Sequence, residues 1–170
     1  MEEEYPKFDS SNLSEEQKEI LSDFFMKRKL FDNYIQEKGV DLFTCPGCSY
    51  PTLLEKGLYE ICSVCSWQDD GQGDIEADEI WGGANLDLSL TENRLLIGNR
   101  LQEIAKKVNG KIIHNPLTIL FMLHWNKDQV RKKLGHFDEK IRTQHLVFTQ
   151  YLETKDLLLG QLIMIDNNQQ

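Results

Sequence analysis

The sequence predicts an α+β protein in which a small β module, built around four cysteines, packs with several α-helices. Apolar residues recur at helical spacing on both sides of a central segment. Within that segment, residues 42–67, short apolar runs alternate with Gly and Pro, as is typical of strands and turns. With 170 residues, 40% of them hydrophobic, the chain suits one domain or one domain with an added module.

The pattern divides the chain into three parts. Residues 1–41 contain an N-terminal amphipathic helix, and residues 42–98 contain the cysteine module and an acidic loop. Residues 99–170 form a mostly helical C-terminal region, which we expect to pack on the rest as one globule. The apolar stretch 117–125 in this region fits a strand or a buried helix equally well.

Two capping boxes predict where the helices begin. Ser14 with Gln17 opens a helix over about residues 15–37. Ser89 with Glu92 opens a second helix, which the Asn-Gly pair at 109–110 is expected to close. We interpret the first as a helix packed on its own core, although a groove-binding helix has the same pattern.

The four cysteines form two Cys-x2-Cys pairs separated by thirteen residues: Cys45 with Cys48, and Cys62 with Cys65. Two residues between the members of a pair let one tight turn aim both sulfurs at a single ion. Four thiolates close a tetrahedral zinc site with no vacancy for water, so the spacing predicts a structural zinc ion in a zinc-ribbon-like module. A redox pair is the weaker alternative, because the second pair leads into an acidic loop rather than a helix.

Three stretches resemble the family of CPCC-type cysteine-rich domains, found mainly in bacteria, over roughly residues 43–98. They are Cys-Pro-Gly-Cys-Ser-Tyr at 45–50, the run from Tyr59 through Trp-Gln-Asp-Asp-Gly at 67–71, and Gly-Gly-Ala-Asn at 82–85. The resemblance implies a zinc-ribbon module, and several such domains look like immunity proteins encoded beside bacterial toxins.

The sequence departs from the family pattern at three places. The family usually has a cysteine where Gly47 stands, a glycine where Ser49 stands and an alanine where Asn93 stands. Without a third cysteine in the first motif, the site still has four sulfurs, which favours Cys45 and Cys48 as its ligands in that motif.

The central segment is strongly acidic. No Lys or Arg lies between Lys56 and Arg94, and the chain as a whole has a net charge of −9. This sign argues against nucleic acid and fits a basic protein surface. We expect the partner to contact two tryptophans and the acids between them: Trp67, Asp69, Asp70, Asp74, Glu76, Asp78, Glu79 and Trp81. A solvated loop is the simpler alternative, and the register of an EF-hand calcium loop fails at Ile75.

The leading hypothesis is a non-catalytic zinc-binding protein that acts by protein–protein binding, in particular an immunity protein that inhibits a basic toxin such as a nuclease. The second is a nucleic-acid- or transcription-associated zinc ribbon, whose basic patch at 127–133 contacts phosphate. The third is an enzyme, but no catalytic motif appears and the four histidines have no acidic partners at ligand spacing.

The start of the sequence is acidic and no run of about 18 apolar residues occurs, so neither a secretory signal nor a membrane span is predicted. The expected location is the cytoplasm, where reduced cysteines bind metal readily.

Overall fold

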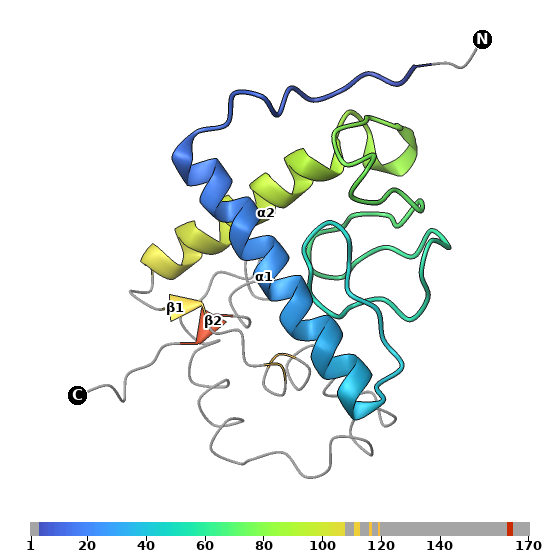
Figure 1. The fold of residues 1–170 in the computed structure, drawn as a ribbon, viewed down its shortest axis with the longest axis vertical. Coiled ribbons are helices and arrows are strands. Elements are labelled where there is room, and N and C mark those ends of the chain that lie inside the picture. The colour runs from blue at the N-terminus through green and yellow to red at the C-terminus, as the bar shows by residue number, and fades with distance from the viewer. Residues whose placement is uncertain (1–3, 108–110, 113–115, 117–118, 120–162, 165–170) are drawn as a thin grey trace. The chain divides into compact units, whose positions relative to one another are not determined.

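The computed structural model describes residues 4–107, 111–112, 116, 119 and 163–164 (Figure 1). Its elements are α1 (Glu15–Lys38), the 3-10 helix η1 (Gly83–Asn85), α2 (Leu90–Lys107), and the two-residue strands β1 (Lys111–Ile112) and β2 (Ile163–Met164). β1 pairs with β2 in antiparallel fashion, with Lys111 opposite Met164.

Several predictions for the C-terminal region lie outside the described residues. They concern the Asn-Gly pair at 109–110, the apolar stretch 117–125 (apart from the single residue 119), the basic patch at 127–133 and the four histidines. Most of the region 99–170 that we expect to be helical is likewise outside them.

The chain divides into two compact units. The first comprises Met1–Asp32 and Leu42–Gly98, and the second comprises Asn33–Asp41 and Asn99–Gln170. All contacts of the cysteine module described below lie within the first unit. Among the described residues, no helix combines the length and the apolar run that crossing a bilayer would require.

Both predicted capping boxes are present. The backbone N–H of Gln17 donates to Ser14 Oγ at 3.1 Å, and the backbone N–H of Ser14 donates to Gln17 Oε1 at 2.9 Å. Ser89 and Glu92 make the same reciprocal pair at 2.9 and 3.1 Å. These bonds satisfy first-turn donors that a helix leaves without partners, so α1 and α2 begin where the sequence predicts.

α1 ends in a Schellman motif at Gly39. The backbone of Gly39 has φ +62°, and its N–H donates to the carbonyl of Gln36 at 3.4 Å. The next N–H, that of Val40, donates to the carbonyl of Ile35 at 3.0 Å. Glycine adopts this left-handed conformation without the penalty that a Cβ atom brings, so the chain can leave the helix here.

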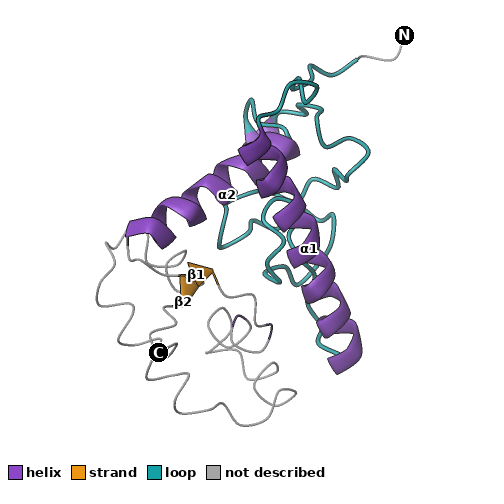
Figure 2. Cartoon of the chain, turned by 60° about the vertical axis from the view of Figure 1, so that its left-hand side comes forward, coloured by secondary structure: helices purple, strands orange, loops and turns teal. Residues whose placement is uncertain are grey.

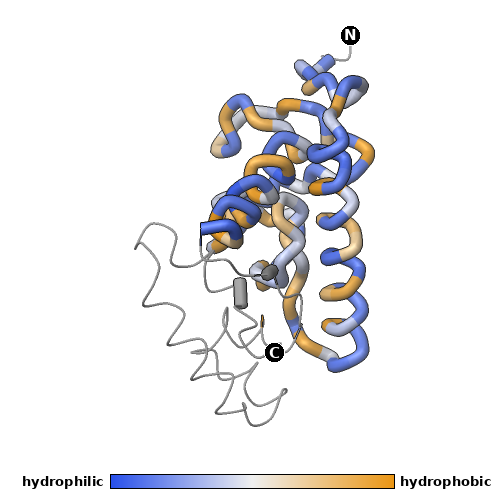
Figure 3. Tube along the Cα trace, turned by 90° about the vertical axis from the view of Figure 1, so that its left-hand side faces the viewer, coloured by the Kyte–Doolittle hydropathy of each residue, from blue (hydrophilic) through white to orange (hydrophobic). Residues whose placement is uncertain are grey.

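α1 presents a narrow stripe to the core of the first unit. The buried positions on it are Ile20, Phe24, Lys27 and Phe31, which share one face at helical spacing. Figure 3 shows hydrophilic and hydrophobic residues following one another along the helices. α1 crosses α2, as Figure 2 shows, and Ile20 lies directly against Gly98 at the crossing.

The predicted α+β fold with a small zinc-ribbon-like β module around the four cysteines is wrong. Between residues 42 and 98 the structure contains turns, η1 and the first part of α2, but no β-strand. The expected strands appear only as isolated bridges, Phe43 with Leu53 and Ile61 with Gln68. The described part of the first unit is therefore two helices holding an irregular cysteine-bearing segment.

Side chains take the place of a β-ladder in this segment. The N–H of Leu54 donates to the carboxylate of Glu60, and the N–H of Gly57 donates to Asp69 Oδ2. Because these amides are already satisfied, they have no need of a neighbouring strand. Tyr59, with φ +64°, also interrupts the extended backbone that a strand requires.

Candidate metal centre

The first cysteine pair lies on a tight turn, or knuckle. The N–H of Cys45 donates to the carbonyl of Tyr50 at 2.9 Å, and the N–H of Ser49 donates to the carbonyl of Cys45 at 2.8 Å. Ser49 has φ +68°, which turns the chain back after Cys48. The N–H of Gly47 donates to Cys45 Sγ at 3.3 Å, a bond that disperses charge on a thiolate.

The second knuckle repeats the first bond for bond. The N–H of Cys62 donates to the carbonyl of Trp67, and the N–H of Ser66 donates to the carbonyl of Cys62, both at 2.9 Å. Ser66 has φ +65°, and the N–H of Val64 donates to Cys62 Sγ at 3.4 Å. The six-residue pattern Cys-x-x-Cys-Ser-aromatic thus occurs twice, a repeat in the sequence that the spacing of the cysteines alone does not reveal.

The two knuckles bring all four sulfurs together. The Sγ atoms of Cys45, Cys48, Cys62 and Cys65 lie within 4.8 Å of one another. The cross-knuckle distances are 3.7 Å from Cys45 to Cys65 and 3.6 Å from Cys48 to Cys62. A disulfide requires about 2.05 Å. A tetrahedron with metal–sulfur bonds of about 2.3 Å has edges of about 3.8 Å, so the sulfurs are arranged to hold a metal ion.

The electrostatics of the cluster also call for a cation. Burial raises the pKa of Cys48 well above its usual value, and the neighbouring sulfurs raise it further. The other three thiols, helped by Thr52, lower the pKa of Cys62 by hydrogen bonding to its thiolate. Thr52 Oγ1 donates to Cys62 Sγ at 3.1 Å. Four thiolates buried side by side repel one another, and a dication is what would stabilise them.

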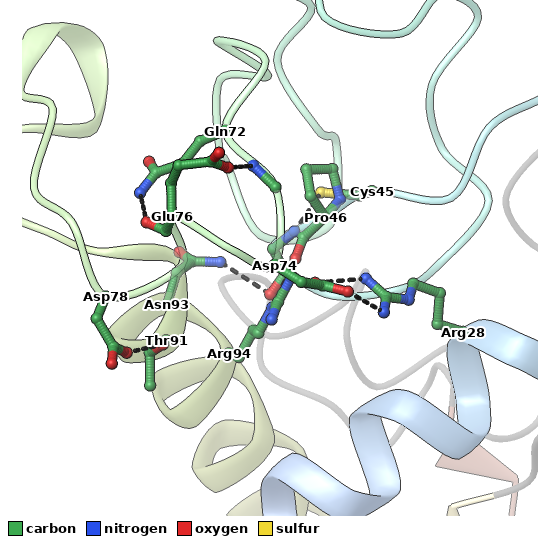
Figure 4. Close-up of polar contacts among 12 residues, drawn as sticks. Arg28, Cys45, Pro46, Gln72, Asp74, Glu76, Asp78, Thr91, Asn93 and Arg94 are labelled. Carbon is green, nitrogen blue, oxygen red and sulfur yellow. Dashed lines mark hydrogen bonds and ion pairs between the residues drawn. The ribbon is translucent and has the colours of Figure 1, made fainter. Parts of the chain in front are cut away.

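α2 fastens the first knuckle through two side chains. The side-chain Nδ2 of Asn93 donates to the carbonyl of Gly47 at 3.0 Å, and Arg94 Nε donates to the carbonyl of Pro46 at 2.9 Å. Figure 4 shows these residues reaching the knuckle from the helix. The lack of a side chain on Gly47 is required here, because an added Cβ would lie 2.5 Å from Asn93 Nδ2.

Asp74 joins the acidic loop to both helices. It accepts hydrogen bonds from both terminal nitrogens of Arg28 on α1, at 2.9 and 2.6 Å, and from Arg94 on α2 at 2.8 Å (Figure 4). These hydrogen bonds lower the pKa of Asp74 to about 2, and those from Arg28 have the largest effect. The paired guanidinium groups compensate the charge of this carboxylate.

The side chain of Asp74 is 47% exposed, but two other residues of the predicted partner surface are buried. Trp67 is 2% exposed, and Asp69 is 3% exposed. The carboxylate of Asp69 accepts from the N–H groups of Gly57 and Gly71, so it organises the loop. Neither side chain reaches the surface in this structure.

The remaining predicted partner residues are partly exposed, and neutral groups bond to them. Asp70 accepts from the N–H of Gln72, and Glu76 accepts from the N–H of Gly73. Asp78 accepts from the hydroxyls of Ser10 and Thr91, and Glu79 accepts from Trp81 Nε1. The carboxylates therefore lie near one another along the loop but do not converge on one point.

The comparisons with known proteins agree with this geometry. The family model described as Cysteine-rich CPCC matches residues 43–99, a third of the chain, and this confirms the resemblance drawn from the sequence. No curated protein and no solved structure matches the chain. In residues 43–99 the chain thus carries a match to the cysteine-rich CPCC family, with four cysteines arranged to hold a metal ion.

Proposed function

We propose that this protein is a non-catalytic zinc-binding protein that inhibits a basic partner, as an immunity protein inhibits a bacterial toxin such as a nuclease. Four thiolates in a tetrahedral arrangement suit zinc, which cross-links the chain when bound and leaves no open position for chemistry. The role of the metal is then to hold the acidic loop in shape, and the loop is what meets the partner.

The uncompensated charge of the loop is the observation that carries this proposal. Of the loop carboxylates, Asp74 is paired with arginines, whereas Asp70, Glu76 and Glu79 accept hydrogen bonds from neutral groups. Among the described residues no ion pair cancels their negative charge, which therefore extends into solvent. Such a field speeds encounter with a basic protein and can occupy a cleft built for phosphate.

Trp81 supplies an aromatic anchor beside these charges. Its ring lies 5.6 Å from that of Tyr5, which is 47% exposed. The N-terminal segment is held against the loop by the N–H of Ile80, which donates to the carbonyl of Pro6 at 2.8 Å. Exposed aromatic pairs next to charged groups are common anchors of protein interfaces.

The test combines capture of the partner with charge removal. Tagged full-length protein is used to capture proteins from its host, and each captured protein is assayed for an activity that the complex inhibits. The variant Asp70→Asn/Glu76→Gln/Glu79→Gln keeps a hydrogen-bond acceptor at each position and removes three charges. We expect its association rate to fall by about tenfold or more at low salt, and to depend less on salt than that of the wild type.

The matched control is Glu16→Gln/Glu19→Gln/Glu37→Gln, which removes three exposed charges from α1 and should leave the association rate close to that of the wild type. A partner that binds the neutral loop variant as fast as the wild type would contradict the electrostatic mechanism. Recovery of nucleic acid in place of a basic protein would contradict the inhibitor role.

A further inference from the structure

Lys27 is a charged residue in the middle of an apolar stripe. On α1 it follows Phe24 by three residues and precedes Phe31 by four, so it faces the core of the first unit. It is 7% exposed, and the described residues offer it no hydrogen bond or ion pair. Burying an ammonium group in this way costs several kcal/mol unless another charge compensates it.

Most of the compensating charges available to Lys27 are those of the cysteine cluster. Its Nζ lies 4.1 Å above the ring of Tyr50, which closes the first knuckle. Burial lowers the pKa of Lys27 to about 8, while Cys48, Asp23, Cys65 and Cys45 act in the opposite direction. Three of these four groups are cysteines of the cluster, although Lys27 lies outside the segment that matches the family.

The charge balance changes when a metal binds. Four thiolates around a dication have a net charge of about −2. Lys27 approaches this centre from α1, and Arg94, whose Nε is bonded to the knuckle, approaches it from α2. Arg94 pairs with the carboxylate of Asp74, which also pairs with Arg28, whereas Lys27 has no carboxylate within ion-pair distance among the described residues. Lys27 is thus the cation most dependent on the thiolates.

We propose that Lys27 is the counter-charge of the metal–thiolate centre, so that metal binding and the docking of α1 strengthen each other. Lys27 acts as a positioning residue, because it touches the ring of Tyr50 and not the metal. The inference rests on the proposed zinc site. It adds to that site a determinant on a helix outside residues 43–99, so the isolated family segment would bind zinc more weakly than the full chain.

The sign of two effects distinguishes this role from simple packing. A methionine at position 27 fills similar space without a buried charge, so it should leave the metal-free protein equally stable or more stable. The same change removes the positive charge that stabilises the metal–thiolate dianion. Outer groups of this kind affect metal affinity by about 10- to 100-fold.

The experiment measures Zn²⁺ affinity by competition with a chromophoric chelator, using the full chain. We expect Lys27→Met to bind Zn²⁺ about tenfold more weakly than the wild type, or weaker still, and Lys27→Arg, which keeps the charge, to recover at least part of that loss. Lys29→Met, an exposed change on the same helix, should have no effect. Urea unfolding of the metal-free forms tests the other effect, which is that Lys27→Met is as stable as the wild type or more stable.

Labelling of lysines with an amine-reactive reagent, followed by mass spectrometry, provides an independent readout. Lys27 should be protected in the zinc-loaded wild type and labelled after chelation, whereas Lys29 should be labelled in both. Equal Zn²⁺ affinity of Lys27→Met and the wild type, or protection of Lys27 after chelation, would overturn the proposal. A wild type that binds no Zn²⁺ would instead overturn the metal site itself.

Discussion

Gly47 and Asn93 occupy one small space beside the first knuckle. Both positions differ from the cysteine and alanine that the resemblance to the family leads us to expect there. In the structure the side chain of Asn93 reaches into the volume that a Cβ at position 47 would fill, and it bonds to the carbonyl of Gly47. The two departures are therefore in direct contact, and each accommodates the other.

A double-mutant cycle tests this coupling. Gly47→Ala should destabilise the protein by about 1–3 kcal/mol, because the new methyl group meets the buried amide of Asn93. Asn93→Ala leaves the Gly47 carbonyl without its donor and should cost about 1–3 kcal/mol. The added methyl group would still lie 3.0 Å from Cβ of Trp67, so we expect Gly47→Ala to cost less in the Asn93→Ala background than in the wild type without becoming neutral, as measured by urea unfolding. Additive losses would show that the two residues do not interact.

Between elements, the crossing of α1 and α2 depends on Gly98. A Cβ at this position would meet Cγ2 of Ile20 closer than any real contact, so the helices approach as near as they do only because Gly98 has no side chain. Alanine in place of an interior helix glycine ordinarily stabilises a helix by about 1 kcal/mol. The close approach reverses that expectation here.

We predict that Gly98→Ala destabilises the protein by about 1–3 kcal/mol, despite the better helix propensity of alanine. The measurement is the urea midpoint of the full chain. In the Ile20→Ala background, Gly98→Ala should lower the free energy of unfolding by less than it does in the wild type. A more stable Gly98→Ala variant would show that the helices separate at little cost.

Asp74 connects the acidic loop with two helices, and its stability contribution should depend on pH. Its folded-state pKa is lowered to about 2 from an ordinary value of 3.8, chiefly by hydrogen bonds from Arg28. A lowered pKa stabilises the folded state above about pH 4, and this contribution is lost as the pH falls through about 2. The loop then loses its link to both helices.

The measurable consequence is that the stabilities of the wild type and Asp74→Asn become similar in acid. Asp74→Asn should be less stable than the wild type at about pH 6, and the gap between their urea midpoints should narrow as the pH falls from about 4 to about 2. Loss of metal at low pH affects both proteins alike, so it does not produce this convergence. Asp87→Asn, at an exposed site, should show no such gap; a gap that stays constant would contradict the ion-pair role of Asp74.

Considered as a whole, the first unit relies on its cysteines. Residues 42–89 contain no strand or α-helix among them, so few ladder hydrogen bonds hold this stretch together. Its buried core includes the cysteines themselves, with Cys45 and Cys48 at 0% exposure. The four cysteines are arranged to hold a metal ion, and under our proposal that ion cross-links the two knuckles and supplies the order that a sheet would have provided.

Removal of the metal should therefore destabilise this unit. We expect chelation to change the tryptophan fluorescence, because Trp67 is buried beside the second knuckle, and to lower the midpoint of thermal unfolding. Zn²⁺ should restore both, and Cys65→Ser should behave as the chelated protein does. Unchanged fluorescence and melting after complete removal of the metal would show that packing alone maintains the fold.

Short-range sequence patterns were enough to specify the starts of both helices, the end of α1 and the membership of the four-cysteine cluster. Each of these depends on interactions within a few residues: a capping box, a glycine in the left-handed conformation, or a tight turn between two cysteines. The same locality explains why the resemblance to the family was visible over roughly residues 43–98, where the family model matches residues 43–99.

The remaining features depend on contacts between segments far apart in the chain. The expected strands did not form because side chains such as Glu60 and Asp69 satisfy the amides that a ladder would have used. Asp74 became the ion-pair partner of two arginines and Lys27 a core residue, because their environments come from distant segments. Spacing along a sequence specifies local turns, but the partner of a buried charge is chosen by how the helices pack.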